Sequence, residues 1–367
     1  MINMKGRGAV RLRKTLCCLL AGALLSVPLL MGCGSGNKET SAVSESSAET
    51  SKDSSVIVSD VTSDVSDGGS KASSDISDVS GNKSTIKPAM WKVEDDSGHY
   101  CYMFGTVHAA DDSADIMPDY FENAYLDSDA IGVEADITYI LENPLGVSNL
   151  YKYLIYMDGT KIQDHISEET YNAVSEVMKN NSSAYIEHMY DMFKPVAWSS
   201  VFEGEALKKC GLDTEKGIDI RAIKRAKSDG KEVIELESVE YQAQMFERLS
   251  DRLGELLLLP YTTQEGFDQQ VEDIGKLYDD WKNGRPVEEN VDESQLEQLD
   301  AETREAYEYY MDEMLGKRNP AMADKISGYL NEGKKVLVMV GSAHFYGDDG
   351  LVKLMESKGC KVTSIAS

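Results

Sequence analysis

Two short motifs that end in histidine follow apolar segments near the two ends of the folded part of the sequence. The motif G-T-V-H, residues 105–108, closes the run YCYMFGTVH, and G-S-A-H, residues 341–344, closes KKVLVMVGSAH. Glycine lets the backbone approach a neighbour closely, and histidine supplies an imidazole that can bind a metal or transfer a proton. Because the chain contains only five histidines, we consider His108 and His344 candidate site residues.

A third apolar segment adds carboxylates to this pair. The sequence AIGVEAD, residues 130–136, predicts a strand with Glu134 and Asp136 at its carboxyl end. Two imidazoles and the Glu134 carboxylate on neighbouring strands would form a divalent-metal site with positions left open for water or substrate. Alternatively, the same histidines and Glu134 would perform general acid–base chemistry without a metal.

The elements around these motifs alternate between strand and helix. The segment 89–108 predicts a hairpin, 118–129 a helix that starts at a proline, and 217–238 a helix, a glycine turn and a strand. The end of the chain reads as strand, helix and strand, which is typical of a βαβ unit. We therefore expect an α/β fold with a mixed, mostly parallel sheet, flanking helices and a large helical insertion, in which ligands bind at the carboxyl ends of strands.

The middle of the chain is expected to be mostly helical. A long helical region from about residue 167 to 209 is predicted to break at Lys194-Pro195, and residues 239–332 are again mostly helical. Three polar residues there leave alternatives open. Asp219 is either a helix N-cap or a site residue, and Glu237 and Gln242, beside a predicted strand end, are either solvated or in the site. The remaining histidines, at positions 99, 165 and 188, lie in turn-like, polar or helical contexts that indicate surface roles.

The first 87 residues are not expected to be part of the folded domain. Residues 1–33 combine a basic start, a short apolar stretch and the sequence LMGC, which resembles a bacterial lipobox with Cys33 as the lipidated residue. An uncleaved N-terminal anchor is the alternative. Residues 34–87 are rich in Ser and Asp, which predicts a disordered linker. The domain from 88 to 367 is therefore expected to be extracytoplasmic and lipid-anchored to the cell membrane of a bacterium.

The charge and the cysteines exclude several classes of protein. The chain has 37 Lys and Arg against 64 Asp and Glu, a net charge of −27, which argues against nucleic acid as a partner. The cysteines after Cys33 have no C-x-x-C pair and predict ordinary buried thiols rather than a disulfide framework. No H-E-x-x-H, G-x-S-x-G, P-loop or G-x-G-x-x-G motif is present, which disfavours zincins, α/β-hydrolases, NTPases and dinucleotide enzymes.

Three blocks of the sequence together resemble the TraB/GumN family, also called TraB/PrgY/GumN. The first is FGTVHAADDSADIMPDYFENAYLDSDAIGVEADI, and the second is GLDTEKGIDIRAIKRAKSDGKEVIELESVEYQAQMF. The third is GKRNPAMADKISGYLNEGKKVLVMVGSAHFYGDDGLVKLMESKGCKV. They occur in the family's order over about residues 88–366. The resemblance implies a fold related to the erythromycin-esterase and ChaN-like proteins, and kinship with the Tiki metalloproteases.

The resemblance also implies roles for individual residues. His108, Glu134 and His344 would be metal ligands or catalytic groups of a peptidase that depends on a divalent ion such as Mn, Co or Zn. Arg318 would position substrate or steady Glu134. The expected function is hydrolysis of peptides or protein termini; the alternatives are a protein that binds a peptide signal without cleaving it and a metal-independent, esterase-like hydrolase. Oligomeric state does not follow from the sequence.

Overall fold

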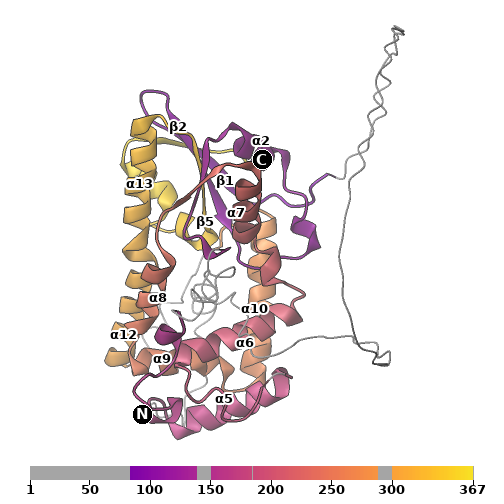
Figure 1. The fold of residues 1–367 in the computed structure, drawn as a ribbon, viewed down its shortest axis with the longest axis vertical. Helices are drawn as coiled ribbons and strands as arrows, with labels where there is room; N and C mark the ends of the chain where they lie inside the picture. The colour runs from indigo at the N-terminus through magenta and orange to yellow at the C-terminus, as the bar shows by residue number, and fades with distance from the viewer. Residues whose placement is uncertain (1–82, 139–149, 184, 288–299, 367) are drawn as a thin grey trace, which may run out of the picture. The chain divides into compact units, whose positions relative to one another are not determined.

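The computed structural model of the chain describes residues 83–138, 150–183, 185–287 and 300–366 (Figure 1). The predicted leader over 1–33, the lipidation at Cys33 and all but residues 83–87 of the predicted linker lie outside the described residues. Within the described part of the chain, no helix is both long and apolar enough to cross a membrane.

A six-stranded sheet in the order β4-β3-β5-β2-β1-β6 forms the centre of the fold. Strands β2, β5, β3 and β4 pair in parallel, whereas β1 pairs antiparallel with both β2 and β6. The prediction of a mixed, mostly parallel sheet is confirmed. The strands are β1 (Met90–Glu94), β2 (Tyr100–Thr106), β3 (Ala130–Val133), β4 (Glu232–Glu235), β5 (Val336–Gly341) and β6 (Lys361–Ser364).

Helices cover both faces of the sheet. In Figure 1, α13 (Arg318–Glu332) lies on one side, and α2 (Asp119–Asp127) and α7 (Ile218–Asp229) lie on the other. Helix α13 packs against α14 (Leu351–Ser357), and α7 packs against β3 and β4. Strand β5 is buried on both faces, which explains why its sequence is a continuous apolar run rather than an alternating one.

The βαβ unit predicted at the end of the chain has a wide crossover. Strand β6 runs in the same direction as β5 but lies at the edge of the sheet, beyond β2 and β1. Both sides of β5 are already occupied, by β2 and β3, so the chain after α14 reaches the next free position beside β1.

The other helices form the expected insertion at the carboxyl ends of the strands. They are α5 (Glu168–Asn181), α6 (Pro195–Lys209), α8 (Val239–Glu247), α9 (Asp251–Leu258), α10 (Gln264–Lys282) and α12 (Ala301–Met311). Helix α6 packs against α9 and α10, and the rings of Phe202 and Tyr261 stack there at 4.5 Å.

The break in the first helical region is wider than predicted. Helix α5 ends at Asn181, and regular helix resumes only at Pro195. Asn181, Ser182 and Ser183 are polar residues whose side chains compete for backbone hydrogen bonds, which favours an end to the helix before the proline.

Candidate functional site

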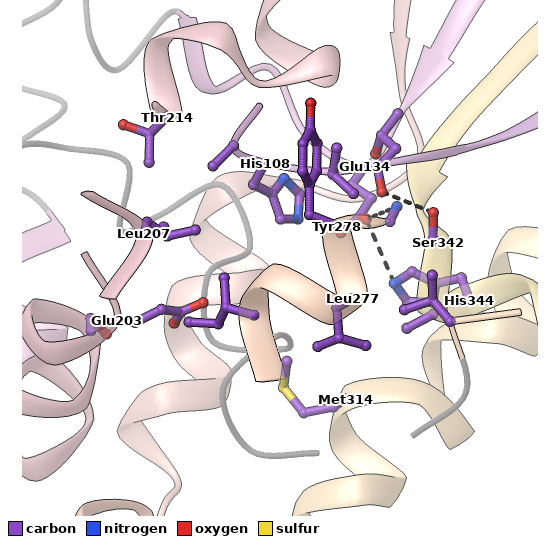
Figure 2. A pocket seen from close by; sticks show the side chains of 18 of the residues that line it. His108, Glu134, Glu203, Leu207, Thr214, Leu277, Tyr278, Met314, Ser342 and His344 are labelled. Carbon is purple, nitrogen blue, oxygen red and sulfur yellow. Dashed lines mark hydrogen bonds and ion pairs between the residues drawn. The ribbon is translucent and has the colours of Figure 1, made fainter. Parts of the chain in front are cut away.

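The carboxyl ends of three parallel strands bring the predicted site residues together. Thr106 of β2 lies beside Gly341 of β5, and Val133 of β3 lies beside Met339. His108, Glu134 and His344 follow these strands and lie around Gly341 in one pocket (Figure 2). A Cβ atom on Gly341 would lie 3.2 Å from Oε1 of Glu134, 3.8 Å from Cδ2 of His344 and 3.9 Å from Nε2 of His108.

His344 is fixed by an asparagine from α13. Its Nδ1 lies 2.5 Å from Oδ1 of Asn319, whose Nδ2 donates to the carbonyl of Asp349 at 2.9 Å. Because Asn319 presents its oxygen to the ring, Nδ1 carries the proton and donates it. Burial and the charge of Arg318 lower the pKa of His344 to about 3. The neutral ring therefore presents an unprotonated Nε2 toward Oε1 of Glu134, 3.6 Å away.

Glu134 is a buried carboxylate held by three donors. Arg318 Nη2 lies 2.5 Å and Gln242 Nε2 3.1 Å from its Oε2, while the backbone N–H of Gly341 donates to Oε1 at 2.7 Å. Burial opposes ionisation, but the charges of Arg318 and His108 and the hydrogen bond from the Gly341 backbone hold the pKa of Glu134 well below its usual range. The carboxylate is therefore an anion at any pH near neutrality.

Arg318 joins Glu134 to a second carboxylate. Its Nε and Nη2 each lie 2.8 Å from an oxygen of Glu237, and Nη1 donates to the carbonyl of Met314 at 3.0 Å. Gln242 donates to Glu237 at 3.0 Å as well as to Glu134. Glu237 and Gln242, for which the sequence left two readings open, thus belong to the site.

His108 is paired with a carboxylate from α7. Its Nδ1 lies 2.6 Å from Oδ2 of Asp219. Burial opposes protonation of the ring, but Asp219 raises the pKa of His108 to about 9. Of the two readings of Asp219, the site contact is the one observed, because the N-cap of α7 is Gly217 and no N-cap hydrogen bond from a side chain is made there.

The backbone on which His108 lies is fixed by the start of α7. The N–H of Ile218 donates to the carbonyl of Val107 at 2.9 Å. A Cβ atom on Gly217 would lie only 2.6 Å from the carbonyl oxygen of His108, so glycine is required for this close approach.

The pocket extends from these polar groups to the helical insertion. It has a volume of about 150 Å³ and is lined by the site residues and by apolar side chains that include Leu207, Phe246, Ile274 and Leu277. Glu203 of α6 lies at the helical end, and Figure 2 shows its carboxyl group reaching toward the pocket. Burial raises the pKa of Glu203 to about 8, opposed by the charge of His108.

Glu203 was not identified from the sequence, although a signal existed. It lies four residues after Ser199 and three before Ala206, both buried on α6, so helical periodicity places a carboxyl group on the buried face. Asn319, which bonds His344, was not identified from the sequence either.

Other predicted candidates lie outside the pocket. Asp136, after β3, pairs with Lys227 at 2.7 Å and does not line the pocket. None of the histidines at positions 99, 165 and 188 lines it either.

The site residues offer donor atoms for a metal ion but do not form a complete coordination site. The two histidines use Nδ1 for Asp219 and Asn319 and leave Nε2 for the pocket, as second-sphere hydrogen bonds do at metal centres. Over the described ranges of the chain, however, no three His, Cys, Asp or Glu side chains are grouped closely enough to hold an ion together.

Comparisons with known proteins match most of the chain. A sequence model of the TraB/PrgY/gumN family matches residues 89–364. An uncharacterized protein, YbaP, from Shigella flexneri is 25% identical over 258 residues, which cover 70% of this chain and 88% of YbaP. YbaP of Escherichia coli K12 is 25% identical over 256 residues, which cover 69% and 87%. No solved structure matches the chain significantly.

Proposed function

Since the chain belongs to the TraB/PrgY/gumN family, we propose that it is a metal-dependent peptidase acting on peptides or exposed protein termini. One observation carries the proposal. The unprotonated Nε2 of His344 and the anionic Oε1 of Glu134 lie 3.6 Å apart with no hydrogen atom to share. Two acceptors that face each other in a buried site are stabilised by a cation between them.

The donor set fits a divalent ion such as Mn, Co or Zn. His344 and Glu134 would hold it, and His108 faces the same space around Gly341. Imidazole nitrogen and carboxylate oxygen suit these ions, and three protein ligands or fewer leave a position for substrate. A bound ion would polarise a peptide carbonyl and lower the pKa of a water molecule.

The chain's own residues supply orientation and charge. Glu134 is a weak proton acceptor because its pKa is held low, so its role in the proposal is that of a fixed anion rather than a general base. Arg318 holds this carboxylate in place. His108, whose pKa is raised to about 9, carries a proton that it can direct at a carbonyl oxygen or a departing amine. The apolar wall of the pocket excludes water.

A protein that binds a peptide without cleaving it is the second candidate. The observation that favours it is the full engagement of Glu134 by Arg318, Gln242 and Gly341, together with the lack of a three-ligand cluster over the described residues. A metal-independent, esterase-like hydrolase would instead use His108 and its partner Asp219 as the acid–base pair.

One experiment separates these functions. The full-length chain is freed of metal with a chelator, supplied with Mn²⁺, Co²⁺ or Zn²⁺, and incubated with a peptide library analysed by mass spectrometry. We expect cleavage that requires the ion and is lost in His344→Ala and Glu134→Ala but kept in His99→Ala, whose ring is exposed and bonds Asp95. Cleavage without any ion supports the esterase-like reading, and retention of intact peptides supports the binding reading.

We also propose that the protein is a lipoprotein held outside the cytoplasmic membrane through Cys33. The support is the basic start, apolar stretch and LMGC sequence of residues 1–33. Expression in a bacterium with radiolabelled palmitate should label the parent chain and not Cys33→Ala. Equal labelling of the two, or recovery of the parent in the soluble cytoplasmic fraction, contradicts this localisation.

A further inference from the structure

Glu203 is a buried carboxyl group that the proposed chemistry does not use. Only 4% of the residue is exposed, and it makes no hydrogen bond or ion pair with any described part of the chain. The other buried carboxylates among the described residues all have partners. Glu134 bonds Arg318, Asp219 bonds His108 and Glu255 bonds Thr170. Asp191 bonds Tyr171, Asp273 bonds Gln269 and Glu313 bonds Lys317. Glu203 is thus an exception that requires a physical explanation.

The surroundings of Glu203 would not favour a carboxyl group for stability alone. Figure 2 shows Glu203 in the same pocket wall as the apolar side chains of Leu207, Leu277 and Met314. Burial of a polar group without a hydrogen-bond partner destabilises the folded state. A ligand group that enters the pocket and bonds to the carboxyl would offset this cost.

The charges in the pocket indicate the sign of that group. Arg318 faces two carboxylates, Glu134 and Glu237, and the His108 imidazole is balanced by Asp219. Before Glu203 is counted, and with no metal ion bound, these buried charges therefore already sum to a negative value. A cationic ligand is favoured over an anionic one in such a cavity.

We propose that Glu203 binds an ammonium group of the ligand, carried on an apolar chain that fills the space between α6 and the strand ends. The carboxyl accepts hydrogen bonds from the ammonium, and the apolar wall covers the chain. That the carbonyl group of the same ligand lies beside His108 and His344 rests on the proposed function. The ammonium subsite depends on Glu203 alone. The raised pKa of this carboxyl is consistent with a group that ionises fully only when a cation is beside it.

A small non-hydrolysable probe tests the subsite independently of catalysis. Binding of hexylammonium and of 1-hexanol to the full-length chain is measured by ligand-observed NMR titration, for the parent and for Glu203→Gln. The parent should bind the ammonium roughly 10-fold or more tightly than the alcohol, as expected for a charge-assisted hydrogen bond. In Glu203→Gln this preference should disappear.

Glu205→Gln is the matched control, because it removes a carboxylate from the same helix at a position bonded to Ser182 and Lys208, outside the pocket lining. It should keep the preference of the parent. A preference that survives in Glu203→Gln, or a parent that binds both probes equally, overturns the proposal. Thermal unfolding of the variants verifies that each is folded.

Peptide probes identify where the ammonium comes from. Three peptides of one apolar sequence are compared: one with a free N-terminus and no lysine, its N-acetylated form, and the acetylated form with a lysine added. Tighter binding of the first indicates an α-ammonium, and tighter binding of the third a lysine side chain. Equal binding of all three overturns the proposal.

The two hypotheses fail in different ways. If no peptide is cleaved with any ion but the ammonium preference is present and lost in Glu203→Gln, the peptidase function is wrong and the subsite remains. If peptides are cleaved but Glu203→Gln keeps the parent's preference, the subsite is wrong and the peptidase function remains.

Discussion

Nδ1 of His344 lies 2.5 Å from the side-chain oxygen of Asn319, and this single contact determines which nitrogen of the ring faces Glu134. Asn319 cannot reverse its amide without losing the bond from its Nδ2 to the carbonyl of Asp349. The proton is therefore held on Nδ1, and Nε2 is available to a ligand.

The first prediction follows from this contact. Asn319→Ala removes the group that orients the His344 ring, and loss of such a partner typically lowers metal affinity 10–100-fold. Titration calorimetry with Zn²⁺ and Mn²⁺ measures the change. Asn283→Ala, which alters an exposed asparagine bonded to Asp279, should bind as the parent does. Equal affinities in Asn319→Ala and the parent would contradict the role of Asn319.

The second prediction concerns the buried pair at the centre of the site. Arg318→Met leaves Glu134 and Glu237 buried without a cation, and removal of one partner of a buried pair destabilises by about 3–5 kcal/mol. Urea denaturation measures the free energy of unfolding. Arg285→Met, at an ion pair that is about half exposed, should cost less than about 1 kcal/mol. Similar losses for the two variants would show that the Arg318 network contributes little to stability.

The third prediction is a pH dependence that originates at Glu203. Its pKa is raised to about 8 from 4.5 by burial, so between these values the folded state binds more protons than the unfolded state. The contribution of the protonated Glu203 carboxyl to the free energy of unfolding is therefore complete below about pH 4.5 and is lost as the pH rises through 8. Between these pH values the free energy of unfolding falls by on the order of 1.4 kcal/mol per pH unit.

Glu203→Gln cannot ionise and should remove this dependence. The variant is expected to unfold at a higher temperature than the parent at pH 8 and to differ little from it at pH 5, when both are measured by calorimetry. A constant difference in melting temperature across this range would mean that Glu203 titrates normally.

The fourth prediction tests the close approach of α7 to the His108 loop. In Gly217→Ala the new Cβ would lie 2.6 Å from the carbonyl oxygen of His108, and relief of such overpacking costs about 1–3 kcal/mol. Gly328→Ala, on α13 with nothing within 4 Å of its Cβ position, should be neutral or stabilise by up to about 1 kcal/mol. Chemical denaturation measures the stability of both variants. Equal stability of Gly217→Ala and Gly328→Ala would contradict the packing argument.

The sequence predicted the strands and helices better than the hydrogen-bond partners of the site residues. The apolar runs before His108 and His344 correctly indicated buried strands, because a strand covered on both faces has no polar alternation. The AIGV run likewise located β3, which Glu134 directly follows. By contrast, the bond between His108 and Asp219 joins residues 111 apart, and that between Gln242 and Glu134 joins residues 108 apart. Local spacing carries no information about such pairs, and only the folded topology brings them together.

Glu203 shows a second limit of prediction from the sequence. Its place on the buried face of α6 follows from helical periodicity, but a single glutamate in an otherwise mixed helix does not reveal whether a partner neutralises it. That depends on α10 and the strand ends, which contribute the facing wall of the pocket. The absence of a partner among the described residues emerges only from the structure.

Titration calorimetry of the full-length, metal-free chain with Mn²⁺, Co²⁺ and Zn²⁺ tests the central claim most directly. The site formed by Glu134 and His344 predicts that the parent binds one ion per chain, and that His344→Ala and Glu134→Gln each weaken this binding at least roughly 10-fold. His165→Ala, whose ring bonds Asp251 outside the pocket, should bind as the parent does. Binding of the ion by His344→Ala with the affinity of the parent, or no binding by the parent, would contradict the claim.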